Sequence, residues 1–289
     1  MPGLPPASID THAHIFEPAL TPVAGARYVP DYAATLDQYL AVMTANGVDR
    51  AVLVQPSFLG SDNSYLLSAL AAAPERLRGV IVVSAGDVRS ELSDERVESL
   101  DGAGIRGVRL NLIGQPLPDL FSLEWQAAAA AMAKHGWHLE IQASGQQWLH
   151  LAPAIRTWPG KLVIDHLGLP QPEYPESIQT VLELASLKHV WVKVSGPYRS
   201  SRQQAEMMFA ELLERGCADR LVFGSDWPFT RHEEQTFTEV LAWAQALAGD
   251  DLLQSILTTN PASLLDWPAI RLPSPGVIDS GKSTDTEAA

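Results

Sequence analysis

The feature that most constrains the fold of this chain is a regular alternation of short apolar runs with longer segments of helical pattern. Eight runs have the length and character of buried strands, and they span residues 9–16, 51–55, 79–83, 107–112, 137–142, 162–166, 190–195 and 221–223. Helical segments follow over about residues 35–45, 63–73, 93–103, 123–135, 147–157, 176–187 and 202–215, then 233–247 and 252–258, and Asn260 with Pro261 is expected to stop the last helix. This succession predicts an α/β fold with a closed parallel sheet, the TIM (β/α)8 barrel.

The length of the chain fits one such barrel with short extensions. Barrels of this kind take about 250 residues, and the chain has 289. We predict that residues 1–268 form a single barrel domain. Residues 269–289 are rich in Pro, Ser and Gly and then acidic, which predicts a disordered tail.

The charge balance limits the partners of the protein. A formal net charge of −14 argues against binding to nucleic acid or to a membrane surface, so the expected partner is a small molecule. A site for an anion must then be built from local arginines. The single cysteine, Cys217, excludes an internal disulfide bond, and neither a secretory leader nor a run of ~20 apolar residues is present, so we expect a cytoplasmic protein. A homo-oligomer is compatible with the sequence, which leaves the oligomeric state open.

Four polar side chains stand where strands end, on the face at which such barrels bind substrates. Asp226 follows the apolar run 221–223 and precedes a proline, and it is our first candidate for a catalytic carboxylate; the alternative is an Asp that caps the next turn. His12 and His14 lie two residues apart, on one face of a strand, where they could share a metal or polarise a carbonyl group. His166 ends another strand. Each histidine alone has a structural alternative, but the four together indicate an active site.

Further residues are candidates for binding the substrate. Arg109 and Asn111 share one face of the fourth strand, and the guanidinium of Arg109 matches a carboxylate, unless it pairs with an internal acid such as Glu140 or Asp165. Arg199 follows the seventh strand and offers a second anion contact, with a solvated loop position as the alternative. Tyr28 offers a phenol hydroxyl, although such a tyrosine often only packs.

These segments resemble those of a known family, the amidohydrolase superfamily. The resemblance rests on Asp10–Phe16, Gly107–Asn111, Ile164–Gly168, Lys193–Ser195 and Gly224–Pro228, and it extends from about Ile9 to Trp267. The segments are most similar to the branch that contains 2-pyrone-4,6-dicarboxylate lactonase, 4-sulfomuconolactone hydrolase and sugar lactonases. The resemblance implies a TIM barrel in which Asp226 is the general base for water and His12, His14 and His166 surround the reacting carbonyl. It further implies that Arg109, Arg199 and Tyr28 hold carboxylates or other polar groups of the substrate.

The fifth strand departs from the pattern of the metal-dependent members. Those members generally place a metal-binding histidine near the end of this strand, where this chain has Gln142, which we place with Asn111 among the substrate-binding residues. His12, His14 and Asp226 alone would make a weak zinc site. We therefore expect that no metal is required; the alternative is a zinc ion held by these three residues and completed by Glu140 or His166.

The sequence thus predicts a hydrolase that opens the lactone ring of a small substrate bearing a carboxylate. One alternative is a zinc-dependent amidohydrolase or a non-oxidative decarboxylase of the same superfamily. Another, of a different class, is a barrel that binds a small acid without turning it over. The identity of the lactone is left open.

Overall fold

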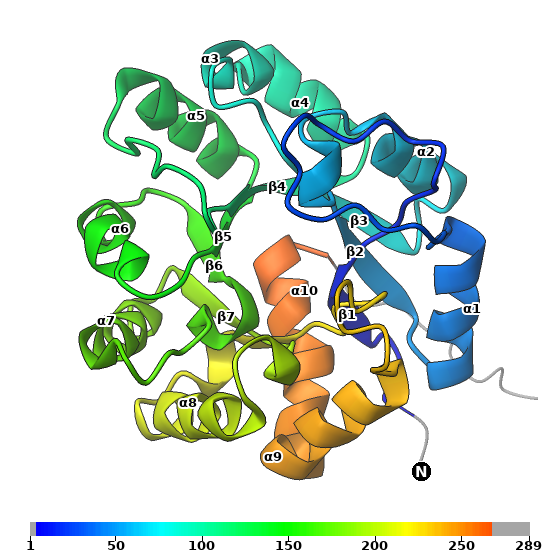
Figure 1. The fold of residues 1–289 in the computed structure, drawn as a ribbon, viewed down its shortest axis with the longest axis vertical. Coiled ribbons are helices and arrows are strands. Elements are labelled where there is room, and N and C mark those ends of the chain that lie inside the picture. The colour runs from blue at the N-terminus through cyan, green and yellow to red at the C-terminus, as the bar shows by residue number, and fades with distance from the viewer. Residues whose placement is uncertain (1–3, 268–289) are drawn as a thin grey trace, which may run out of the picture.

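Eight parallel strands follow one another around a barrel in chain order (Figure 1). The computed structural model describes residues 4–267, and within them the strands are β1 (Ile9–Ala13), β2 (Arg50–Val54), β3 (Leu77–Ile81), β4 (Ile105–Asn111), β5 (His138–Gln142), β6 (Lys161–Ile164), β7 (Val190–Val194) and β8 (Leu221–Phe223). Each strand pairs with the next in parallel register, and β1 also contacts β8. The predicted TIM barrel is confirmed. The tail predicted over residues 269–289 lies outside the described residues.

Helices cover the outside of the barrel, as Figure 1 shows. They are α1 (Leu36–Asn46), α2 (Ser64–Ala72), α3 (Val88–Glu91), α4 (Asp94–Gly102), α5 (Leu123–Lys134), α6 (Gln147–Arg156), α7 (Pro175–Ala185), α8 (Arg202–Glu214), α9 (Phe237–Leu257) and α10 (Thr259–Leu265). Side-chain caps define where several of them begin: Thr35 and Thr236 each form a capping box, which satisfies backbone N–H groups that have no partner within the helix. Within residues 4–267, no helix combines the length and the apolar character needed to cross a membrane.

The last two helices differ from the prediction. The two predicted segments, 233–247 and 252–258, are joined in one element, α9, that begins only at Phe237 and ends at Leu257, with a break at Gly249, whose φ is 67°. Asn260 and Pro261 do not stop a helix but lie in the first turn of α10. A proline is tolerated there because the first N–H groups of a helix have no intrahelical acceptor. The Asn260 side chain anchors α10 by donating hydrogen bonds of 2.8 Å to the carbonyls of Ala218 and Leu221.

Two predicted strands are shorter than expected, and this places two histidines beyond the sheet. β1 ends at Ala13, so His14 lies just after it. β6 ends at Ile164, and His166 belongs to the turn η2 (Asp165–Gly168). Both side chains therefore lie where the backbone leaves the barrel.

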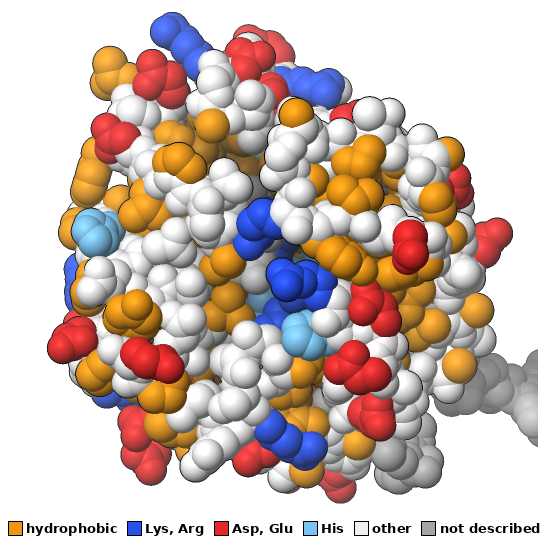
Figure 2. Space-filling model, in the orientation of Figure 1, with side chains coloured by type: hydrophobic (Ala, Val, Ile, Leu, Met, Phe, Trp, Pro, Cys, Tyr) orange, Lys and Arg blue, Asp and Glu red, His pale blue; other side chains and the backbone are white. Residues whose placement is uncertain are grey.

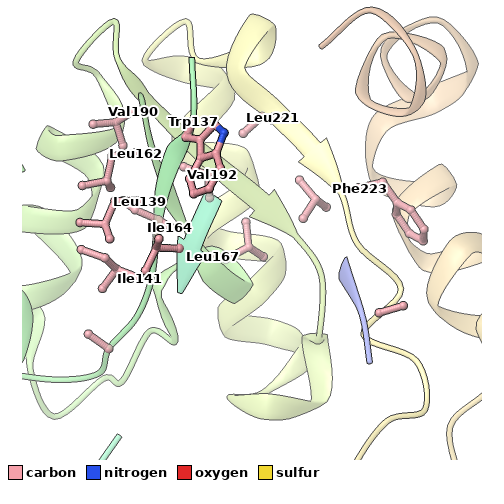
Figure 3. Close-up of a cluster of buried hydrophobic side chains, with 14 of the residues drawn as sticks. Trp137, Leu139, Ile141, Leu162, Ile164, Leu167, Val190, Val192, Leu221 and Phe223 are labelled. Carbon is pink, nitrogen blue, oxygen red and sulfur yellow. The ribbon is translucent and has the colours of Figure 1, made fainter. Parts of the chain in front are cut away.

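Side chains alternate along the strands between the interior of the barrel and the helix layer. In Figure 3, Leu139 and Ile141 of β5, Leu162 and Ile164 of β6, and Val190 and Val192 of β7 lie with other apolar side chains in the layer between sheet and helices. The residues between them face the interior, as expected from the period of two in a strand. Burial of this large apolar layer is the main contribution to stability.

One end of the barrel interior is apolar. We call it the lower interior cluster, and it consists of Ile9, Val52, Val54, Val80, Val163, Trp191, Val222, Leu264, Leu265 and Trp267. Its last three residues come from α10 and the segment after it, so this helix closes that end of the barrel (Figure 1). The guanidinium groups of Arg50 and Arg78 lie 4.8 and 4.3 Å from the centroid of the Trp267 ring.

The seam between β8 and β1 is closed largely by side chains. Buried Asp10 accepts hydrogen bonds from the backbone N–H and the hydroxyl of Ser225, at 2.8 and 2.6 Å, and from the Tyr39 hydroxyl at 2.7 Å. The Thr11 hydroxyl donates to the carbonyl of Phe223 at 2.7 Å. The motif that follows β8 is therefore held against β1.

Candidate active site

A cavity of about 570 Å³ opens where the strands end, within the range of small-molecule sites. Figure 2 shows Lys and Arg side chains gathered around a hollow near the centre of this face. The polar residues that line the cavity are His14, Arg27, Tyr28, Ser57, Arg109, Asn111, Gln115, Gln142, Arg199, Thr230, Arg231 and His232. The chain as a whole is acidic, so these arginines concentrate positive charge at the mouth.

His12, His14 and Asp226 converge beside the cavity; His14 lines it, whereas His12, Asp226 and His166 are buried behind its wall. The Nε2 atoms of the two histidines are 3.2 Å apart, and Asp226 Oδ1 lies 3.8 Å from His12 Nε2 and 3.9 Å from His14 Nε2. Backbone hydrogen bonds fix this geometry: the Asp226 N–H donates to the His12 carbonyl, and the His14 N–H donates to the Trp227 carbonyl, both at 2.8 Å. The side chains predicted from two distant segments thus meet across the seam.

The carboxylate of Asp226 is held by one oxygen. Oδ2 accepts hydrogen bonds from Arg199 Nε and, at 2.8 Å, from the Tyr198 hydroxyl, whereas Oδ1 has no hydrogen-bond partner among residues 4–267. Burial opposes ionisation, but the Arg199 guanidinium holds the pKa of Asp226 well below its ordinary value. Asp226 has a positive φ of 65°, a conformation that is uncommon outside glycine and that clusters at functional sites. The turn directs Oδ1 toward the histidines.

His166 reaches the site from the strained turn after β6. Its φ is 48° and that of Leu167 is 55°. Its ring stands edge-on to that of His12, with 4.9 Å between centroids, and Nδ1 lies 2.8 Å from the Ser195 hydroxyl. Burial lowers the pKa of His166 to about 4 and that of His14 to about 3, so both rings are neutral at neutral pH. Nε2 of His166 has no hydrogen-bond partner in the described part of the chain.

Beneath the histidines lies a set of four buried charges, which we call the charged network: Arg109, Glu140, Asp165 and Lys193. Lys193 Nζ contacts Glu140 Oε2 and lies 3.3 Å from Asp165 Oδ1. Arg109 Nε lies 3.0 Å from Asp165 Oδ2 and 3.3 Å from Glu140 Oε1. Two cations face two carboxylates, so the charges balance, and all four side chains are at most 3% exposed.

Lys193 is a candidate that the sequence reasoning missed. The argument that singled out Arg109, a charge within an apolar strand, applies equally to Lys193 in β7 and to Glu140 in β5. Both alternatives for Arg109 are present in the structure, because it pairs with the internal acids and also lines the cavity. The Nη2 atom of Arg109 donates to Gln142 Oε1 at 2.6 Å, which orients Gln142 at the cavity wall.

The rim of the cavity comes from loops. Asn111 accepts a hydrogen bond of 3.2 Å from Arg27, and the Tyr28 hydroxyl donates to Glu233 at 3.0 Å. Glu233 also accepts from Tyr32 at 3.0 Å, which ties the loop after β1 to the loop after β8. Burial and then the nearby charges of Arg231 and Arg109 lower the pKa of Arg27. Arg27 and Arg231 did not stand out in the sequence, because a single arginine in a loop has no periodic signal.

The positions of His12, His14 and Asp226 would suit a divalent metal ion, but the hydrogen bonds of His12 would not. Around a tetrahedral zinc ion, ligand atoms lie roughly 3.3 Å apart, which is close to the separation of 3.2 Å between the two Nε2 atoms. A metal-bound histidine normally donates its other ring N–H to an acceptor. His14 meets this requirement, with Nδ1 2.7 Å from the Val54 carbonyl, but His12 Nδ1 faces the amine of Lys193 at 2.8 Å. The donor set therefore does not fit a metal at His12.

Comparisons with known proteins agree on one family. The family model described as amidohydrolase (Amidohydro_2) matches residues 9–267. The chain is 30% identical to 4-sulfomuconolactone hydrolase of Rhizobium radiobacter, over 91% of each chain, and 28% identical to 2-pyrone-4,6-dicarboxylate hydrolase of Comamonas testosteroni, over 92% of each. A crystal structure from Acinetobacter baumannii, described as a probable 2-pyrone-4,6-dicarboxylic acid hydrolase with citric acid bound, superposes with a TM-score of 0.84 at 33% identity, covering 90% of this chain and 100% of that one.

Proposed function

This chain belongs to the amidohydrolase family, its relatives are named as hydrolases of lactones, and we propose that it opens the ring of a small lactone that carries an anionic group. The protein is an enzyme, a hydrolase that acts on a cyclic ester. The proposal adds the roles of the residues and the charge of the substrate.

The observation that carries the proposal is that one carboxylate oxygen of Asp226, Oδ1, accepts no hydrogen bond from the described residues. This atom is buried next to His14, which lines the cavity, while Oδ2 is fixed by Tyr198 and by Arg199, which lines the cavity as well. A carboxylate held in this way can accept a proton from a water molecule as that water attacks the carbonyl carbon of the lactone. We assign Asp226 as the general base.

Neutral imidazoles supply the polar surroundings of the carbonyl oxygen. His12, His14 and His166 are buried, and burial lowers the pKa of each. An uncharged imidazole N–H can donate a hydrogen bond to the oxyanion that develops in the transition state. His166 is favoured for this role because its Nε2 is not engaged by any other described residue.

The anionic group of the substrate would bind to arginine and would also raise the low pKa of Asp226. In the free enzyme Arg199 stabilises the ionised carboxylate, which weakens it as a base. A substrate carboxylate that binds Arg199 would share this cation, so the pKa of Asp226 would rise in the complex. Arg109, Asn111, Gln142 and Tyr28 line the same cavity and complete the proposed contacts to the substrate.

Hydrolysis of a panel of lactones, with and without carboxylate groups, tests the proposal. We expect turnover of carboxylate-bearing lactones that persists after treatment with a chelator. Asp226→Asn should lower kcat by about 10²–10⁴, while circular dichroism shows an intact fold. The matched control is Asp219→Asn, at an exposed aspartate before β8, which should leave kcat unchanged.

Two results would contradict the proposal. Full activity of Asp226→Asn would remove the assigned base. Activity that is lost when a chelator removes bound zinc, and that returns when zinc is added back, would favour the zinc-dependent hydrolase or decarboxylase. Binding of a small acid without turnover of any lactone would favour a binding protein.

A further inference from the structure

We infer that Lys193 fixes the tautomer of His12 and thereby closes the His12–His14 pair to divalent metals. Lys193 is a positioning residue in this scheme, since it acts through His12. The inference starts from hydrogen-bond donors and acceptors and goes beyond the proposed function.

The first step is the direction of the hydrogen bond between Lys193 and His12. An ammonium group has three donors and no acceptor. Lys193 Nζ lies between Glu140 and Asp165 and is 2.8 Å from His12 Nδ1, so Nδ1 must be the acceptor. The nearest oxygens of the two carboxylates, Glu140 Oε1 and Asp165 Oδ1, are 3.5 Å from the same nitrogen, and within residues 4–267 neither has a hydrogen-bond partner.

The second step follows the proton to the other nitrogen of His12. A neutral imidazole carries one N–H, and with Nδ1 accepting, it is Nε2 that carries the hydrogen. His14 Nδ1 lies 2.7 Å from the Val54 carbonyl, which can only accept, so the His14 hydrogen is on Nδ1 and its Nε2 is an acceptor. The 3.2 Å contact between the two Nε2 atoms is then a hydrogen bond from His12 to His14. One chain of donors leads from Lys193 through His12 and His14 to Val54.

The third step is the consequence for metal binding. A metal ion needs the lone pair of the nitrogen that it binds, and in this chain of hydrogen bonds His12 Nε2 carries a hydrogen and His14 Nε2 accepts it. Binding an ion there would require the His12 hydrogen to move to Nδ1, against the ammonium of Lys193. In the same arrangement the single N–H of His12 is engaged by His14 Nε2.

The tautomer can be measured directly in the unmodified protein. In ¹⁵N-histidine-labelled protein, two-bond ¹H–¹⁵N correlation spectra distinguish a protonated Nε2 from a protonated Nδ1, and His12→Gln assigns the His12 signals. We expect His12 in the Nε2–H form and His14 in the Nδ1–H form. A His12 ring protonated on Nδ1 would overturn the inference.

Metal affinity gives the second test. Loss of Lys193 alone would leave an unbalanced buried carboxylate, so the variant is Glu140→Gln with Lys193→Met, which keeps the remaining charges of Arg109 and Asp165 balanced. Asp165 can then accept the His12 Nδ1–H, and calorimetric titration with Zn²⁺ should show affinity higher than wild type by about 10–100-fold, the effect typical of such partners. Lys193→Arg retains a donor and should bind Zn²⁺ as wild type does.

Controls separate this inference from the proposed function. Adding His12→Gln to the double variant should abolish the gain in Zn²⁺ affinity, and thermal unfolding reports whether each variant is folded. Equal Zn²⁺ affinity of wild type and a folded double variant would overturn the inference. All of these measurements are made without substrate, so a failure to hydrolyse any lactone would defeat the proposed function and leave them unaffected.

Discussion

The two ends of the barrel interior are lined by the same strands but hold opposite kinds of side chain. Val163 of β6 belongs to the lower interior cluster, and Asp165, two residues further along the chain, belongs to the charged network. In β7 the same step of two residues leads from Trp191 to Lys193. The lower interior cluster is apolar, and the cations beside it, Arg50 and Arg78, stand over the Trp267 ring. The upper end holds four charges, in which each cation faces a carboxylate. Burial is complete at both ends, so the pairing of polar groups, rather than access to water, distinguishes the site from the core.

The largest effect is expected from placing an unpaired charge at the lower end. Val163→Asp should lower the free energy of unfolding at pH 7 by about 4 kcal/mol or more, because full burial raises the pKa of a carboxyl group by up to 3–5 units. A raised pKa means that the native state keeps its proton, so this penalty should shrink as the pH falls from 7 to 5. Urea unfolding at both values measures it.

The matched control for this substitution is Val163→Asn, which has the same shape as the aspartate without its charge. Its penalty should not change with pH. A pH-independent penalty for Val163→Asp as well would show that the lower end can pair a carboxylate, contrary to the comparison.

The upper end should make stability depend on pH in the opposite sense. Burial lowers the pKa of His166 to about 4, from an ordinary value of 6.5. Between these values the unfolded chain binds a proton that the native state does not, so stability falls as the pH decreases through this window and levels off below it. The loss from pH 6.5 to pH 5 is on the order of 2 kcal/mol for this histidine.

His166→Gln removes this titrating group and should flatten the dependence of the unfolding free energy on pH by that amount. Val163→Asn, at the other end of the barrel, should leave the slope as it is in wild type. If the unfolding free energy of His166→Gln depended on pH as that of wild type does, His166 would have the same pKa in the native and the unfolded state.

The smallest effect on the fold is expected at the rim of the cavity. Arg27→Ala should raise KM for an anionic lactone by about tenfold, which corresponds to about 1.4 kcal/mol, and leave kcat unchanged, because Arg27 lies at the mouth and not beside Asp226. Stability should change by less than ~0.5 kcal/mol, as for most exposed positions. Arg202→Ala is the control, since Arg202 is exposed in α8 and pairs with Glu206. Equal KM values for the two variants would show that the rim arginines do not contact the substrate.

The barrel was predictable because its signals repeat. Eight apolar runs with helical segments between them indicate one architecture, and the places where those runs end locate His12, His14, His166 and Asp226. The prediction was wrong at Asn260–Pro261, because a proline that interrupts a helix and a proline in its first turn look alike in sequence.

The charged network was harder to predict because it depends on contacts between strands. Arg109, Glu140, Asp165 and Lys193 belong to four consecutive strands or strand ends, and no local spacing relates them. A buried charge in a strand signals that a partner exists but does not identify that partner. The choice between an ion pair and a substrate contact for Arg109 needed the geometry, and Arg109 makes the ion pair while it also faces the cavity.

The side chains proposed to react and those at the rim of the cavity are held by different parts of the molecule. The positions of Asp226 and His12 depend on a backbone hydrogen bond between them and on Asp10 and Ser225 beneath, all within the body of the barrel. The arginine and tyrosine of the rim, Arg27 and Tyr28, come from a loop that shares none of these bonds. Exchange of that loop between relatives, in evolution or by design, would therefore change the lining of the cavity and leave the spacing of Asp226 and His12 intact.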